Sequence, residues 1–150
     1  MTDRIERTVD LKAPVARVWK ALTDHVEFGT WFRVKLDGPF EAGRVSTGHI
    51  TSPGYEHLRW EAVVQKIEPE RAFSFTWHPY AVEPGTDYSQ ETPTLVEFTL
   101  EKTATGTRLR VVESGFDKLP AHRRDTAFQR NGEGWTIQME NIAQHLDQHA

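Results

Sequence analysis

The feature that most constrains the fold is a single apolar stripe near the C-terminal end of the chain. Trp135, Met139, Ile142 and Leu146 recur at i, i+4, i+7 and i+11, which places them on one face of a helix. A lone helix must bury such a stripe against another element. Much of the preceding chain alternates with the two-residue period of strands, so we expect the helix to pack on the concave face of an antiparallel sheet.

Two short helices are expected between the first strand and the rest of the sheet. Residues Ile5 to Leu11 alternate between apolar and polar, which predicts a half-buried strand. Pro14 suits the first turn of a helix, and an apolar face at i, i+3, i+4 and i+7 follows it. Asp24 is placed to cap a second short helix that reaches about Thr30.

Further alternating segments predict most of the sheet, over residues 44–50, 58–65, 73–77, 96–101 and 108–113. A polar stretch from His78 to Pro93 is long for a hairpin loop, and long loops in compact domains are often functional or mobile. Pro120 opens the last helical region. The poor helix formers Asn131, Gly132 and Gly134 predict a kink or break in that helix before the apolar stripe.

Composition excludes several classes of protein. The chain of 150 residues has no cysteine, which excludes disulfides, thiolate metal sites and cysteine nucleophiles and fits a reducing cytoplasm. Its N-terminus is charged and lacks the apolar segment of a secretory signal, and no apolar run approaches the length of a membrane span. The net charge of −4 argues against nucleic-acid binding. We expect one cytoplasmic domain over residues 1–150, without a cofactor.

Glu113 is the most informative single residue. The alternation places it on the same face as Leu109 and Val111, and an unpaired buried carboxylate costs several kcal/mol or more. It must therefore be paired, protonated or at a wet cavity mouth, unless the Ser114-Gly115 turn directs it to solvent. The possible partners considered for it are Arg59, His49 and His78.

Large aromatic side chains are abundant, with five Trp, eight Phe and three Tyr. Those on predicted inward faces either pack the core or form the wall of a ligand cavity. With the inward acid and a strand-end histidine, the candidate ligand-binding residues are Trp31, Phe32, His49, Trp60, Phe75, Trp77, Phe98, Glu113, Trp135 and Met139. Tyr88 is a further candidate for orienting a ligand.

Other polar groups have plainer interpretations. His145 and His149 are spaced like a helical metal pair, but no third ligand motif accompanies them, so no metal site is predicted. Arg123, Arg124 and Arg130 form a basic cluster that is either a solvated helix face or a receptor for an acidic partner or an anionic ligand group. The sequence contains no phosphate loop, serine elbow or paired carboxylates at catalytic spacing.

Several motifs, in their order and spacing, resemble a known family over nearly the whole chain. They are Ala13-Pro14 with Val18-Trp19 and residues 21–24, Trp31-Phe32, Gly43, residues 67–69, residues 75–77, residues 106–109, residues 113–116 and Gly134-Trp135. Together they resemble the START/polyketide-cyclase-like (SRPBCC) superfamily. Within it, the similarity is to the AHSA-type family, named after an activator of the ATPase of the heat-shock chaperone.

The resemblance implies an α+β helix-grip fold with a curved antiparallel sheet of about six or seven strands around a long C-terminal helix. It also implies a cavity between sheet and helix. Three functions follow as expectations: a domain that binds a hydrophobic or amphipathic small molecule, a chaperone-associated stress-response module that binds a protein partner, or a cyclase or hydrolase that uses Glu113 with a histidine. No catalytic residues are assigned, because the residues form no catalytic constellation.

Overall fold

The computed structural model describes residues 4–82 and 85–149, and within them the secondary structure has the expected order. One strand precedes two short helices, six strands follow, and a long helix comes last. The elements are β1 (Arg4–Leu11), α1 (Val15–Thr23), α2 (His25–Phe32), β2 (Val34–Leu36), β3 (Val45–Ile50), β4 (Arg59–Glu68), β5 (Ala72–Trp77), β6 (Thr94–Lys102), β7 (Thr107–Ser114), the 3₁₀ helix η1 (Phe116–Lys118) and α3 (Ala121–Gln148).

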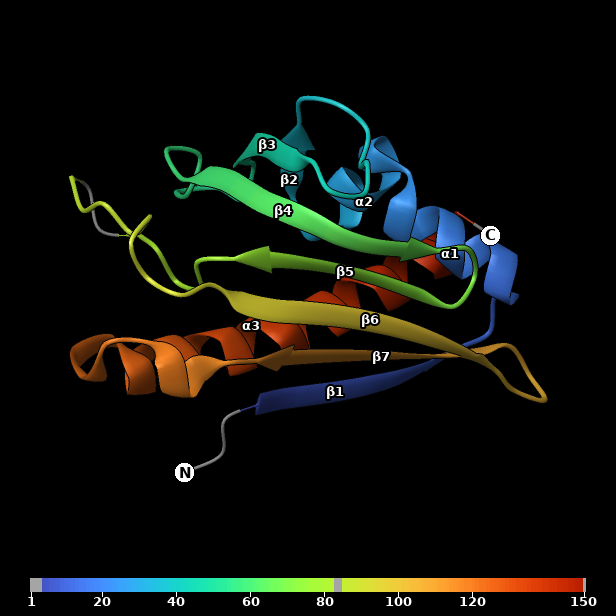
Figure 1. The fold of residues 1–150 in the computed structure, drawn as a ribbon. Helices are drawn as coiled ribbons and strands as arrows, with labels where there is room; N and C mark the ends of the chain where they lie inside the picture. Colours follow the sequence, from blue (N-terminus) through green and yellow to red (C-terminus); the bar gives the residue numbers. More distant parts are fainter. Residues whose placement is uncertain (1–3, 83–84, 150) are drawn as a thin grey trace.

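The strands form one antiparallel sheet in the order β1-β7-β6-β5-β4-β3-β2. The long helix α3 crosses one face of this sheet, and α1 and α2 lie near the end of α3 that carries the C-terminus (Figure 1). The helix-grip fold expected from the sequence is therefore confirmed, with seven strands among the described residues.

Strand alternation decides which side chains face α3. On β4, Trp60, Ala62 and Val64 are buried, whereas the residues between them are exposed. On β7, Val111 and Glu113 are buried on the same face. Because a strand directs alternate side chains to opposite faces, this register places Glu113 inside the fold.

Asp24 caps the second short helix, as the sequence predicts. The Asp24 side chain accepts hydrogen bonds from the backbone N–H groups of Val26 at 3.0 Å and Glu27 at 3.1 Å, which caps α2. The second helix reaches Phe32 rather than Thr30, and it ends where Arg33 adopts a left-handed conformation with φ of 68°.

The predicted break in the last helix does not occur, because α3 runs unbroken from Ala121 to Gln148. Gly132 faces β1, where a Cβ atom would lie only 3.3 Å from the guanidinium of Arg7. That guanidinium donates to the Gly132 carbonyl at 3.2 Å and to Thr136 Oγ1 at 3.0 Å. Close packing against β1 thus explains why residue 132 is a glycine. A glycine costs a helix roughly 1 kcal/mol, and burial of the apolar stripe of α3 outweighs this cost.

Candidate functional site

A buried carboxylate lies between the sheet and α3. Glu113 has no exposed surface, and its Oε2 accepts hydrogen bonds from Trp77 Nε1 at 2.7 Å and Thr94 Oγ1 at 2.6 Å. Its Oε1 accepts from Trp135 Nε1 at 2.8 Å and Asn131 Nδ2 at 2.9 Å, and Asn131 also reaches Oε2 at 3.2 Å. One acid on β7 therefore connects β5, β6 and α3.

These partners are uncharged, unlike the cationic ones considered from the sequence. Indole and amide N–H groups can only donate, so a set of such donors suits an ionised carboxylate, which accepts at both oxygens. Arg59 and His49 lie exposed on the neighbouring strands β4 and β3, and they do not reach the acid. Of the alternatives expected from the sequence, Glu113 is paired, and neutral donors take the place of the partners considered there. It is neither turned out to solvent nor placed at a wet mouth.

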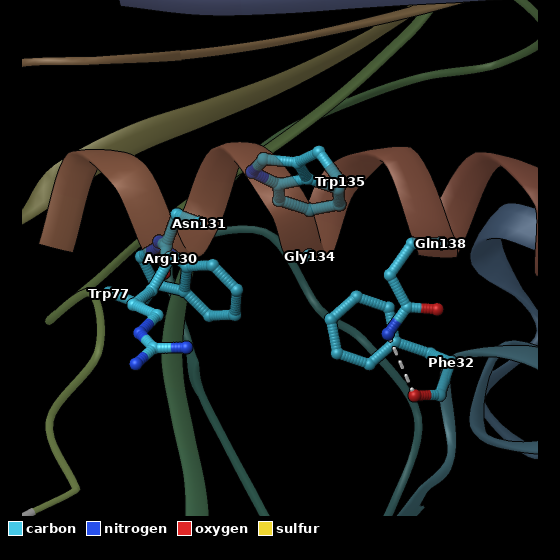
Figure 2. Close-up of a pocket in the computed structure, with 7 residues that line it drawn as sticks. All are labelled: Phe32, Trp77, Arg130, Asn131, Gly134, Trp135 and Gln138. Carbon is cyan, nitrogen blue, oxygen red and sulfur yellow. Dashed lines mark hydrogen bonds between the residues drawn. The ribbon is translucent and has the colours of Figure 1, made fainter. Parts of the chain in front are cut away.

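A pocket of about 120 Å³ adjoins this network. It lies between α3, the end of α2 and the end of β5, as Figure 2 shows. We call it the α3 pocket, and its lining residues are Phe32, Trp77, Arg130, Asn131, Gly134, Trp135 and Gln138.

Three aromatic rings form the apolar wall of the α3 pocket. The ring centroids of Phe32 and Trp77 are 6.3 Å apart, those of Phe32 and Trp135 are 6.1 Å apart, and those of Trp77 and Trp135 are 5.9 Å apart. Gln138 Nε2 donates to the Phe32 carbonyl oxygen at 3.0 Å and links α3 to the end of α2 (Figure 2). Since Glu113 binds both indole N–H groups, the buried acid fixes two of the three rings.

Gly134 provides part of the open space. A Cβ atom built on it would meet nothing within 4 Å, apart from the excluded neighbouring backbone. Unlike Gly132, this helical glycine is not required by a close contact with another element. Its missing side chain leaves room in the α3 pocket at the cost that glycine imposes on a helix.

The interior beneath the pocket is filled by rings rather than by a large cavity. The centroid distances are 5.6 Å from Trp60 to Trp77, 5.5 Å from Trp60 to Phe75, and 5.7 Å from Phe98 to Trp135. These are ordinary packing distances for aromatic pairs. Of the two roles considered for these rings, core packing describes most of them, because they mostly contact one another.

The candidate residues from the sequence thus separate into three groups. Phe32, Trp77 and Trp135 line the α3 pocket, and Glu113 supports it. His49 is exposed on β3. The remaining candidates are buried in the aromatic and apolar core, namely Trp31, Trp60, Phe75, Phe98 and Met139.

Sequence reasoning did not select the polar part of the lining. Asn131, Gly134 and Gln138 were not proposed as site residues, and Arg130 entered only as part of a basic cluster. The spacing could have indicated these residues, because positions 130, 134 and 138 follow one another at i, i+4 and i+8 and so share one helix face beside the apolar stripe. Small and polar side chains next to a buried stripe lie at the edge of the buried helix face, where the helix surface meets solvent.

A second polar network ties the loop after β5 to α3. Arg123 donates to the Glu91 carboxylate at 2.7 Å and to the carbonyl oxygens of Pro79 at 2.9 Å and Tyr80 at 3.0 Å. Its guanidinium carbon also lies 4.6 Å from the centroid of the Tyr88 ring. The Arg123 side chain is only 13% exposed, so the expectation of a solvated basic face is wrong for this residue. Tyr88 packs on Arg123 and is not among the residues that line the α3 pocket.

A third network joins the two short helices to the end of α3. Burial alone would raise the pKa of the Glu27 carboxyl, but hydrogen bonds and charges from His145 and Arg17 outweigh it and hold that pKa below its ordinary value. The Nε2 atom of His145 lies 2.8 Å from Glu27 Oε1, and Arg17 forms an ion pair with the same oxygen. No group of three or more metal-ligating side chains comes together within residues 4–82 and 85–149.

Larger hollows of about 330 to 400 Å³ also occur on the protein. Their described lining residues include no tryptophan and no donor to Glu113. The α3 pocket is smaller, but it alone among these described hollows combines an aromatic wall with a buried polar network. It is therefore the best candidate for a site.

Comparisons with solved structures support the fold over nearly the whole chain. Protein MLL2253 from Mesorhizobium loti is 25% identical, with a TM-score of 0.76 and coverage of 98% of each chain. A protein from Arthrobacter aurescens is 19% identical, with a TM-score of 0.78 over 97% of this chain and 87% of that one. DynU16, a protein in the dynemicin biosynthetic locus, is 25% identical with a TM-score of 0.75, and the match covers 98% of this chain but 48% of DynU16.

Among curated proteins, the comparison finds no match to the chain. No helix in the described residues has the length and apolar character needed to cross a membrane. A family model described as "Activator of Hsp90 ATPase homolog 1-like protein" matches residues 12–147. The match spans most of the sequence and agrees with the helix-grip fold, and the chain therefore belongs to the family of Activator of Hsp90 ATPase homolog 1-like proteins.

Proposed function

We propose that this protein binds a small molecule with an apolar ring in the α3 pocket. The observation that carries the proposal is a ring-lined hollow between helix and sheet whose two indoles are held by a buried carboxylate. Ligand sites are commonly concave, apolar and fitted with a few oriented polar groups. DynU16, one of the similar structures, is a protein of a biosynthetic locus, which agrees with a role in handling small molecules.

The volume of the pocket limits the part of the ligand that it can enclose. A dry apolar cavity of about 150 Å³ is known to accommodate benzene. The α3 pocket, at about 120 Å³, suits one ring or a comparable apolar group rather than a lipid chain or a fused-ring system. The packed rings beneath it, such as Trp60 and Phe75, support the same conclusion.

The contacts of Glu113 favour binding over catalysis. Both of its oxygens accept hydrogen bonds from protein donors, and no part of its surface is exposed. The acid therefore supports the pocket through Trp77, Trp135 and Asn131 instead of touching a ligand. The alternative of a chaperone-associated partner module rests on the family description alone.

The test compares two matched glycine substitutions. Gly134→Leu places a branched side chain in the α3 pocket, whereas Gly38→Leu makes the same change at another position where a Cβ would meet nothing within 4 Å. Single-ring and long-chain compounds are screened against each protein by ligand-observed NMR and thermal shift.

We expect single-ring compounds to bind the native protein and the Gly38→Leu variant, and to lose binding to Gly134→Leu. Bound compounds should also shift the indole ¹⁵N–¹H signals of Trp77 and Trp135. If no compound binds the native protein, or if binding survives Gly134→Leu, the proposal is wrong.

A further inference from the structure

We propose that the ligand of the α3 pocket is an anion, with its ring inside the pocket and its negative group at the mouth against Arg130. This inference rests on the proposed function and adds the charge and orientation of the ligand. It is carried by the distribution of charge and of uncommitted hydrogen-bond donors around the pocket.

Arg130 is the charged residue among the seven described residues that line the α3 pocket. Its side chain is 60% exposed, and its Nη1 lies 3.9 Å from Glu133 Oε1, a contact too long and too exposed to hold it strongly. In Figure 2 the side chain extends away from the axis of α3. The fork of N–H donors on this guanidinium is therefore available to a carboxylate, which it can bind with two parallel hydrogen bonds.

The other two arginines of the cluster do not line the α3 pocket, and each donates a hydrogen bond elsewhere, although Arg124 Nε is buried without a partner. Arg123 is held by Glu91 and by the loop after β5, and Arg124 Nη2 donates to the Leu119 carbonyl oxygen at 3.0 Å. Among the three clustered arginines of the sequence, Arg130 is the one that lines the pocket. The sequence suggested that this cluster could receive an anionic ligand group, and Arg130 is the candidate receptor for it.

The amide donors of the pocket are neutral and largely committed, and Gln138 Nε2 retains a second N–H. Asn131 Nδ2 donates to both oxygens of Glu113, and Gln138 Nε2 donates to the carbonyl oxygen of Phe32. Both indole N–H groups are bound by Glu113 as well. Arg130 remains as the source of strong donors for a polar group on the ligand.

The buried acid Glu113 determines how the ligand is oriented in the α3 pocket. Glu113 lies behind Trp77, Trp135 and Asn131, so an anion pushed into the pocket would approach a negative charge in a poorly screened interior. At the mouth the same anion would meet the positive charge of Arg130 and would keep part of its hydration. Opposite charges at the two ends therefore favour a ligand whose apolar ring enters first.

The experiment uses three probes of nearly equal size and different charge: benzoate, benzamide and benzylamine. Each is titrated into ¹⁵N-labelled native protein, Arg130→Gln and Arg71→Gln, and the indole signals of Trp77 and Trp135 report occupancy. Arg71→Gln removes the same charge at the opposite end of β5 from Trp77, roughly 20 Å away along the strand.

For the native protein we expect benzoate to bind more tightly than benzamide, and benzylamine to bind most weakly. Arg130→Gln should weaken benzoate about three- to tenfold and benzamide much less, whereas Arg71→Gln should change neither. Raising the salt concentration should weaken benzoate alone.

Two outcomes overturn the inference while leaving the proposed function intact: equal binding of all three probes with no effect of Arg130→Gln, or tightest binding of benzylamine. The second would indicate a cation attracted to the indole faces and to Glu113. If none of the probes shifts either indole signal at saturating concentration, the inference fails, and the ring screen with Gly134→Leu then decides the proposed function separately.

Discussion

The substitution Glu113→Gln tests the network that supports the α3 pocket. A glutamine has nearly the shape of glutamate but replaces one acceptor oxygen by a donor group. In one amide orientation its N–H₂ group faces Trp135 and Asn131, and in the other it faces Trp77 and Thr94. The Thr94 hydroxyl and the Asn131 amide can turn to accept, but an indole cannot, so one indole N–H loses its partner in either orientation.

The expected cost follows from the lost partner. A buried donor left without an acceptor costs about 1–3 kcal/mol, and hydrogen bonds to a charged group are the stronger kind. Removing a buried charge returns part of its desolvation cost, which partly offsets the loss. We therefore expect the free energy of unfolding to fall by about 1–3 kcal/mol, or roughly 2–12 °C in melting temperature for a domain of this size.

Urea unfolding measures this loss, and indole ¹⁵N–¹H signals identify the group that causes it. We expect one of the signals of Trp77 and Trp135 to move upfield as its hydrogen bond to the carboxylate is lost. Glu97→Gln is the matched control, because Glu97 is exposed on the adjacent strand β6, and it should change stability by less than about 0.5 kcal/mol. Glu113→Ala should be more destabilising than Glu113→Gln, since it leaves every donor of the network unpaired around a void.

The reasoning would be refuted if Glu113→Gln were as stable as the native protein and both indole signals stayed in place. That result would mean that the carboxylate does not hold the rings. A loss of stability with unchanged indole signals would also contradict the network, because the damage would then lie elsewhere.

Three further predictions concern other parts of the chain. Gly134→Ala should raise the free energy of unfolding by up to about 1 kcal/mol in a thermal melt, whereas Gly132→Ala should give no gain because its Cβ would crowd β1. Folding lowers the pKa of the Glu27 carboxyl, so this group stabilises the folded protein above pH 4.5, its ordinary pKa. That stabilisation is lost as the pH falls through the lower pKa of the folded state. Glu27→Gln should therefore make the free energy of unfolding decline less steeply below about pH 4.5, as measured by unfolding at a series of acid pH values. Glu91→Gln weakens the hold of Arg123 on the loop after β5, so hydrogen exchange and limited proteolysis in that loop should accelerate while the sheet stays protected, and unchanged rates would contradict the assigned contact.

Periodicity made much of the fold predictable. The alternation of β7 placed Glu113 on the inner face, and the stripe containing Trp135 placed α3 against the sheet. Both inferences concern single elements, in which spacing alone fixes which side chains share a face. Asp24 as the cap of α2 was predictable for the same reason, because its partners lie two and three residues away.

The partners of Glu113 were not predictable, because they depend on the packing of three separate elements. The possible partners considered from the sequence were an arginine and two histidines, whereas the structure uses two indoles, an amide and a hydroxyl. The unbroken course of α3 was missed since propensity is a local property and the contact between Gly132 and Arg7 spans 125 residues. The small size of the pocket likewise depends on how closely rings such as Trp60 and Trp77 pack.

The central claim is that a ring enters between Phe32, Trp77 and Trp135, and the most direct test is an intermolecular NOE measurement. A single-ring ligand from the screen, carrying ordinary hydrogen (¹H), is added to protein that is deuterated except at its aromatic side chains. We predict NOEs from the ligand ring to Phe32, Trp77 and Trp135, and their loss in Gly134→Leu. NOEs to aromatic side chains outside this set, or NOEs that persist in Gly134→Leu, would contradict the account.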